Sequence, residues 1–417
     1  MHHPAHHIFE FTPESLREWC TQRGMAPFRA AQVLDWVYRK GVTDPVLMRN
    51  LSKRDRETLG AEMTFLSGDI VAHQFATDGT SKLLIQWDDP DQTDTLPATG
   101  TTPLRIAGES FNGHAPGAAA AGGVRGRQTE CVMIPVLDEE TGRPLRRTAC
   151  ISSQVGCPVG CKFCASGIGG LEGNLSAGRI IEQVWRLSRP AQAGESHGAA
   201  PAQAHTAAAP SSDTNPDRIS NVVFMGMGEP LSNFKAVTHA VRTIAAPWGL
   251  GISARKITIS TVGLPTAIEK LAAELEVPVT LALSLHAPTD ELRRQLIPWA
   301  EYTTIAELLA ACHKWFQKTG REVTLEYTLL RSVNDRPEHA EELARVARSL
   351  RANVNLIRYN EVAGMPFSRP DTKDVRHFQA ILRERGINAH IRRSRGRDIA
   401  AACGQLRHET SEKANVS

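Results

Sequence analysis

One stretch of this 417-residue chain decides how the rest is interpreted, namely Cys157-Pro158-Val159-Gly160-Cys161-Lys162-Phe163-Cys164. Its three cysteines follow a C-x3-C-x2-C spacing, and no nearby fourth Cys or His completes a tetrahedral zinc site. A structural zinc ion takes four protein ligands, whereas an iron–sulfur cluster is held by thiolates, normally four of them. Three thiolates on a four-iron cluster would leave one iron open to a small molecule. An incomplete zinc site and three incidental thiols are the alternatives.

The composition of the whole chain indicates an intracellular globular protein. A length of 417 residues suggests about two or three domains, and a net charge of +3 neither requires nor excludes nucleic acid. The eight unevenly spaced cysteines do not form the framework of a disulfide-rich secreted protein. The chain begins without a signal peptide, and no apolar run approaches the ~18 residues of a membrane span. We therefore expect a soluble, cytoplasmic monomer without membrane contact, with His2, His3, His6 and His7 in a solvated, disordered end.

Composition also divides the chain into parts. Residues 1–68 are predicted to form a helical accessory domain, because Thr12-Pro13 and Ser52 are helix-start signals and residues 28–40 have helical apolar spacing. Residues 69–126 are predicted as connecting strands followed by a flexible insertion from residue 89. Residues 127–406 form the main domain, with a second mobile insertion at 189–217, and residues 407–417 are a tail. Both insertions lack apolar periodicity.

Strand and helix signals alternate through the main domain. Apolar, β-branched runs lie at 149–153, 221–225, 256–260, 279–285, 322–329 and 353–359. Helical stretches follow them near 176–188, 234–246, 265–275, 304–319, 337–351 and 371–385. Repeated strand–helix units imply a parallel sheet with right-handed crossovers. We therefore predict the α/β class and a partial, open (β/α)6 barrel, with its site at the C-terminal ends of the strands.

Polar residues stand where such a site needs them. The cysteine loop follows the first predicted strand, and Gly226-Met227-Gly228-Glu229-Pro230 follows the second. Polar positions then end the later strands, and they include Ser260, Ser284, His286 and Asn360.

The cysteine loop and the Gly-Glu-Pro turn together resemble the radical S-adenosylmethionine (SAM) enzymes. The resemblance implies a [4Fe-4S] cluster on Cys157, Cys161 and Cys164, whose open iron takes the amino and carboxylate groups of SAM. An electron from the cluster then splits a carbon–sulfur bond of SAM. The residues implied to bind SAM are Gly228, Glu229, Ser260, Ser284, Leu285, His286 and Asn360. Each polar one could instead be a satisfied strand-end residue, and His286 could be a general base.

A second group of motifs resembles a narrower family, the dual-specificity ribosomal and transfer RNA adenine-C2 methyltransferases of the RlmN type. The matching stretches are Phe28–Val33, Asn50–Lys53, Thr129–Pro135, Cys150–Cys157, Val223–Pro230, Ala282–Pro288 and Arg395–Leu406. The resemblance covers most of residues 26–88, 127–188 and 218–406. The chain departs from the family pattern at Leu171-Glu172-Gly173 and around Asn360, positions that bear on contacts with the target RNA.

The family chemistry implied here uses two molecules of SAM per turnover. Cys403 takes a methyl group from the first, and a radical made from the second removes a hydrogen atom from that methyl. The carbon then adds to adenine C2, Glu130 takes the C2 proton, and Cys150 attacks the sulfur of Cys403. A Cys150–Cys403 disulfide remains for an external reductant. Arginines before Cys403, including Arg392 and Arg395, would favour its thiolate or hold RNA phosphates.

The implied substrates are 23S ribosomal RNA, at an adenine near the peptidyl-transferase centre, and transfer RNA. An electron donor is a further implied partner. Two alternatives stay open at this point. Antibiotic-resistance relatives methylate C8 of the same adenine through the same cysteines. A non-catalytic RNA-binding assembly factor would keep the cluster only as a structural element. Cys150 and Cys403 could also be small buried apolar side chains.

Overall fold

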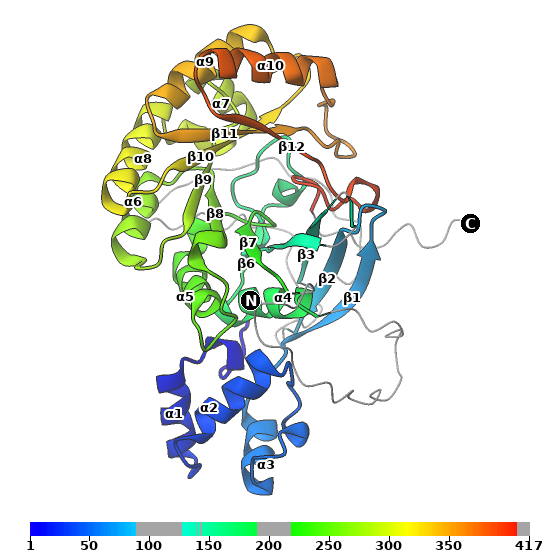
Figure 1. The fold of residues 1–417 in the computed structure, drawn as a ribbon, viewed down its shortest axis with the longest axis vertical. Helices are drawn as coiled ribbons and strands as arrows, with labels where there is room; N and C mark the ends of the chain where they lie inside the picture. The colour runs from blue at the N-terminus through cyan, green and yellow to red at the C-terminus, as the bar shows by residue number, and fades with distance from the viewer. Residues whose placement is uncertain (89–126, 139, 142–143, 190–217, 407–417) are drawn as a thin grey trace, which may run out of the picture.

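The computed structural model describes residues 1–88, 127–138, 140–141, 144–189 and 218–406. The predicted insertions at 89–126 and 189–217, except Arg189, and the tail at 407–417 lie outside these residues. Within the described part, ten strands form one sheet in the order β1-β2-β3-β4-β7-β8-β9-β10-β11-β12, and β5 pairs with β6 in a small second sheet (Figure 1).

The predicted partial barrel is confirmed by the parallel part of the sheet. Its strands are β4 (Pro144–Cys150), β7 (Asn221–Phe224), β8 (Ile257–Thr261), β9 (Thr280–Ser284), β10 (Val323–Leu329), β11 (Ala352–Arg358) and β12 (Ala389–Arg392). The connecting helices are α4 (Ala177–Leu187), α5 (Phe234–Ala245), α6 (Pro265–Glu274), α7 (Asp290–Leu296), α8 (Ile305–Thr319), α9 (Pro337–Arg348) and α10 (Thr372–Glu384). Helices α6, α8, α9 and α10 cover the outer side of the curved strands (Figure 1).

Three details differ from the expectation. The first strand begins earlier than predicted, because the polar residues Arg146, Arg147 and Thr148 of β4 pair with β3 in spite of their composition. The strand β12 and the short helix α7 were not predicted. The sheet is also extended by three antiparallel strands, β1 (Gly68–Phe75), β2 (Ser81–Trp87) and β3 (Gln128–Leu137). These strands place residues from before the first insertion beside the barrel.

The N-terminal helices form as the sequence predicts. Helix α1 (Pro13–Gln22) is capped by the Thr12 side chain, and α3 (Lys53–Glu62) is capped by the Ser52 side chain. The predicted helix at 28–40 begins at Arg29 as α2 (Arg29–Leu34) and continues into a π-helical turn at Asp35–Arg39. These helices lie together at one end of the molecule (Figure 1).

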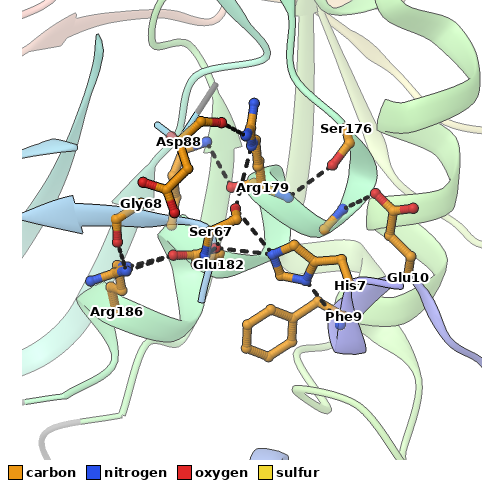
Figure 2. Close-up of polar contacts among 12 residues, drawn as sticks. His7, Phe9, Glu10, Ser67, Gly68, Asp88, Ser176, Arg179, Glu182 and Arg186 are labelled. Carbon is orange, nitrogen blue, oxygen red and sulfur yellow. Dashed lines mark hydrogen bonds and ion pairs between the residues drawn. The ribbon is translucent and has the colours of Figure 1, made fainter. Parts of the chain in front are cut away.

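A buried polar network ties the N-terminal segment to helix α4 (Figure 2). The Nδ1 atom of His7 accepts the backbone N–H of Phe9 at 3.3 Å, so Nε2 carries the ring proton and donates to Glu182 at 3.0 Å. The same carboxylate accepts the N–H and hydroxyl of Ser67, both at 3.0 Å, and its other oxygen contacts Arg186 at 2.6 Å. The expectation of a solvated His7 is therefore wrong, since the burial of Glu182 creates a need for donors that His7 meets.

Candidate active site

A cavity at the C-terminal ends of the parallel strands collects most of the predicted site residues. The predicted residues in its wall are Cys157, Cys161, Cys164, Gly228, Glu229, Ser260, Ser284, His286 and Cys403. The cavity wall does not include Leu285, Asn360, Cys150 or Glu130. Leu285 is fully buried, and its N–H donates to the carbonyl of Glu326 at 3.1 Å. The rule that barrel sites form at strand ends thus located the cavity from the sequence.

The cysteine loop presents its sulfur atoms together with backbone donors. Backbone N–H groups of Val159 and Gly160 point at the sulfur of Cys157, and those of Ser166 and Gly167 at the sulfur of Cys164. Burial raises the pKa of the Cys157 thiol to about 12, and it also raises the pKa values of the Cys161 and Cys164 thiols. Amide donors to sulfur are a feature of iron–sulfur ligation, in which the iron replaces the thiol proton.

A buried arginine near the cysteine loop shows that the loop is suited to an iron–sulfur cluster. Arg293 on α7 is fully buried, and its guanidinium donates to the carbonyls of Val262 at 2.5 Å and Leu285 at 3.3 Å. Its Nη1 atom has no hydrogen-bond partner among the described residues. The charge of Arg293 acts on Cys161, and burial lowers the pKa of Arg293 to about 10. A buried cation with a spare donor near the Cys161 thiol fits an anionic thiolate-ligated cluster.

The Gly-Glu-Pro turn is fixed by close packing. Gly228 has φ +101°, and a Cβ atom there would lie 2.6 Å from the Cβ of Gln154, so only glycine fits. The two carboxylate oxygens of Glu229 accept the backbone N–H groups of Leu231 at 3.0 Å and Val262 at 2.8 Å. Burial raises the pKa of Glu229 to about 7. The acid therefore links the ends of β7 and β8 while its residue lines the cavity.

Ser260 and Ser284 stand at the ends of neighbouring strands, and their hydroxyl oxygens lie 3.2 Å apart. The next polar residue, His286, adopts φ +58°, and its Nδ1 accepts the backbone N–H of Thr328 at 3.0 Å. Burial and, to a smaller extent, Arg293 lower the pKa of His286 to about 3. A neutral ring with its Nδ1 lone pair engaged carries its proton on Nε2, so His286 can donate a hydrogen bond but is poorly suited as a general base.

The other two cysteines of the predicted site, Cys150 and Cys403, are brought together by the C-terminal loop of residues 395–406, called here the Cys403 loop. Ala401 and Leu406 of this loop pack in one apolar cluster with Val132 and Cys150. Burial raises the pKa of Cys150 to about 12. Cys403 is exposed as a residue, but desolvation of its thiol by the protein around it raises its pKa to about 11. The cation of Arg392 opposes both shifts.

Arg392 is itself held at the cavity wall by a residue that the sequence reasoning missed. Its Nη1 lies 3.4 Å from a carboxylate oxygen of Glu326, and both residues line the cavity. Glu326 also accepts from Asn355 at 2.9 Å. An acid in the middle of an apolar strand, as in β10, was the available signal, because a carboxylate is seldom buried without a partner.

Glu130 and Asn360 lie just outside the cavity wall. Glu130 is buried on β3, and its Oε1 is 2.6 Å from the Nζ of Lys82 on β2. Asn360 follows β11, and its side chain contacts the Cys403 carbonyl and Arg369. The structure thus brings all of the predicted polar site residues to one end of the barrel.

An open β/α barrel whose strand ends carry a three-cysteine loop and a close-packed glycine–acid turn is the arrangement of a radical SAM enzyme. The crystal structure of a radical SAM methyltransferase from Sphaerobacter thermophilus matches with a TM-score of 0.78 and 36% identity, over 96% of this chain and 99% of that one. A family model described as the ribosomal RNA large subunit methyltransferase N-terminal domain matches residues 6–64.

Two relatives are described as probable dual-specificity RNA methyltransferase RlmN. The protein of Rhodopirellula baltica is 36% identical over 97% of this chain and 92% of its own length. The protein of Moorella thermoacetica is 39% identical over 96% of both chains. The chain belongs to the RlmN family of RNA methyltransferases. It is a SAM-dependent RNA methyltransferase, with a [4Fe-4S] cluster and SAM as its cofactors. None of the helices in the described residues is long and apolar enough to cross a membrane.

Proposed function

We propose that this enzyme methylates C2 of adenine in 23S ribosomal RNA and in transfer RNA, through a methylated Cys403 and with two molecules of SAM per turnover. One observation carries the proposal. Cys403 lines the same cavity as the three clustered cysteines, and its loop packs against Cys150. A methyl-accepting thiol beside the radical source and a resolving thiol behind it are what this covalent route needs.

Specific atoms of this chain act in each step of the proposed reaction. When bound, the cluster supplies the electron that cleaves SAM, and SAM supplies the methyl group. Cys403 Sγ takes the methyl carbon as a thiolate, whose charge Arg392 favours. The methyl carbon would first lose a hydrogen atom to the radical made from the second SAM, and it would then bond to adenine C2. Glu130 takes the C2 proton, and the adduct passes an electron to a one-electron acceptor.

The release step uses the second cysteine. Cys150 Sγ bonds to Cys403 Sγ, and the electron pair of the carbon–sulfur bond stays with the carbon. That carbon takes up a proton and becomes the methyl group of the product. A dithiol reductant then opens the Cys150–Cys403 disulfide by thiol–disulfide exchange.

The remaining roles are part of the same proposal. Gly228, Ser260, Ser284, Leu285, His286 and Asn360 would shape the SAM site around the turn that Glu229 braces. We also propose a cytoplasmic monomer, with residues 1–68 as an accessory domain and residues 127–406 as the catalytic domain. The RNA substrates favour the cytoplasm.

A C8-adenine methyltransferase is the second candidate, because both cysteines would serve it equally. The match of residues 6–64 to an N-terminal domain of ribosomal RNA methyltransferases favours an RNA enzyme over an assembly factor but does not choose the carbon.

The deciding experiment is an anaerobic assay with a ribosomal RNA fragment that contains the target adenosine, followed by digestion and nucleoside mass spectrometry. We expect 2-methyladenosine from the wild-type enzyme and no methylated nucleoside from Cys403→Ala. Methylated product from Cys403→Ala would remove the covalent route, and 8-methyladenosine from the wild type would move the reaction to C8.

A further inference from the structure

Lys82 lies between two parts of the proposed reaction centre that are far apart in the sequence, Glu130 and the Cys403 loop. Its Nζ is 2.6 Å from Glu130 Oε1 and donates to the backbone carbonyl of Ala400 at 3.4 Å. Both side chains of the ion pair are more than nine-tenths buried, at 9% and 8% exposure. A buried ammonium is stable only with such partners, so its position is strongly determined.

The strand register explains why Lys82 reaches both partners. Lys82 on β2 pairs with Val132 on β3, and Val132 pairs with Cys150 on β4. Residues paired across neighbouring strands point to the same face, as does Glu130, which lies two residues before Val132. One face of the sheet therefore presents the proposed base, the resolving cysteine and Lys82 toward the Cys403 loop.

The turn between β1 and β2 also contacts the Cys403 loop. Asp78 accepts the backbone N–H of Gly396 at 3.0 Å and lies 4.0 Å from Arg395. In return, Asp398 accepts the backbone N–H of Thr77 at 2.9 Å. These contacts hold the loop where Ala400 has a left-handed φ of +49°, a conformation that a non-glycine residue keeps only under constraint.

We propose that Lys82 is a positioning residue, which holds the Glu130 carboxylate and the Cys403 loop in one arrangement during the RNA reaction. The inference rests on the proposed function. Its physical basis is that one cation contacts both the group that takes the C2 proton and the loop that carries the adenine adduct. Loss of Lys82 should therefore slow removal of the C2 proton more than the earlier methylation of Cys403.

The test compares Lys82→Met with the wild type in the anaerobic RNA assay. We expect Lys82→Met to methylate Cys403 within about twofold of the wild-type extent, measured by protein mass spectrometry without RNA. Product should fall at least about tenfold, while covalent protein–RNA adduct accumulates on a denaturing gel although Cys150 is intact. Lys82→Arg keeps the charge and both contacts, so it should restore most of the product.

Two controls make the result decisive. Lys314→Met removes an exposed lysine that contacts Glu269 at 2.7 Å on the outer helices, and it should leave adduct and product unchanged. Cys150→Ala should accumulate adduct. Its failure to do so overturns the proposed route and this inference with it, whereas adduct in Cys150→Ala but none in Lys82→Met overturns the inference alone.

A purely structural role for Lys82 predicts a different pattern. Cys403 methylation, adduct and product would then fall in proportion in Lys82→Met, and that result also overturns the inference. If thermal melting shows that Lys82→Met does not fold, Lys82→Gln replaces it, because its amide can still donate to the carboxylate or the carbonyl. The same accumulation of adduct is expected from Lys82→Gln, and a lack of adduct in that variant likewise overturns the inference.

Discussion

The side-chain amide of Asn360 donates a hydrogen bond of 3.2 Å to the backbone carbonyl of Cys403. The Oδ1 atom of Asn360 accepts from Arg369 at 2.8 Å, and the residue is 2% exposed. The sequence resemblance implies a SAM contact for Asn360. In the structure, the amide has protein partners on both of its sides, and one of them is the backbone of the proposed methyl-accepting residue.

Replacement of Asn360 should therefore affect the methylation of Cys403 itself. Asn360→Asp cannot donate to the Cys403 carbonyl and places a negative charge against it, at a cost of about 1–3 kcal/mol. We expect the single-turnover rate of Cys403 methylation to fall at least about tenfold. Mass spectrometry of the protein measures this rate. Asn353→Asp is the control, since this half-buried amide near the start of β11 contacts Glu322 at 3.2 Å and not the Cys403 loop. Equal rates in the two variants would argue against this positioning role.

Comparison of Gly228→Ala with Gly364→Ala should distinguish the effect of backbone strain from that of a steric clash at the proposed SAM site. The alanine Cβ would lie 2.6 Å from Gln154 at a residue with φ +101°, whereas Gly364, with φ +82°, has nothing within 4 Å. Strain of this kind costs about 1–3 kcal/mol at either position. We expect Gly228→Ala to weaken SAM binding at least about tenfold by calorimetry, and Gly364→Ala to lower only the melting temperature. Unchanged SAM affinity in Gly228→Ala would place SAM elsewhere.

The buried network around Glu182 should make stability depend on acid pH. Burial alone would raise the pKa of Glu182, but hydrogen bonds from His7 and Ser67 and the charge of Arg186 hold it below its ordinary value of 4.5. Because the folded pKa is depressed, the stabilisation is complete above the unfolded value and is lost as the pH falls through the folded value.

Glu182→Gln should lower the free energy of unfolding by about 3 kcal/mol at pH 7, since it leaves Arg186 buried without its counter-charge. Denaturant unfolding at several pH values measures this difference, which should shrink below about pH 4.5. Glu269→Gln, in the exposed pair with Lys314, should change stability by less than about 1 kcal/mol at any pH. A pH-independent loss in Glu182→Gln would contradict the charge-based account.

The sequence predicted those parts of the fold that depend on local pattern. Apolar runs that alternate with helical stretches predicted the parallel strands. The rule that barrel sites form at strand ends predicted that the cysteine loop and His286 share one cavity. The strand β12 was missed because Ala389–Arg392 is short and half polar, so that only its pairing with β11 defines it. The insertions predicted from composition lie outside the described residues, and composition could not show that β1 and β2 join the barrel sheet.

Contacts between residues distant in the sequence could not be predicted for the same reason. His7 is buried by Ser67 and Glu182, and nothing in its own neighbourhood indicates those partners. Lys82 and Glu130 belong to strands on either side of the first insertion, so their ion pair depends on strand register rather than on a motif. The position of Glu326 within β10 was a local signal, but its pairing with Arg392 at the end of the barrel depends on the fold.

The fully buried Arg293 affects the stability of the protein before its cofactors bind. A guanidinium with a nitrogen left unsatisfied by the described residues weakens the chain until an anion compensates its charge. Binding of a cofactor to the folded state alone stabilises that state by mass action. Loading of the cofactor would therefore raise the resistance of this enzyme to unfolding and to proteolysis.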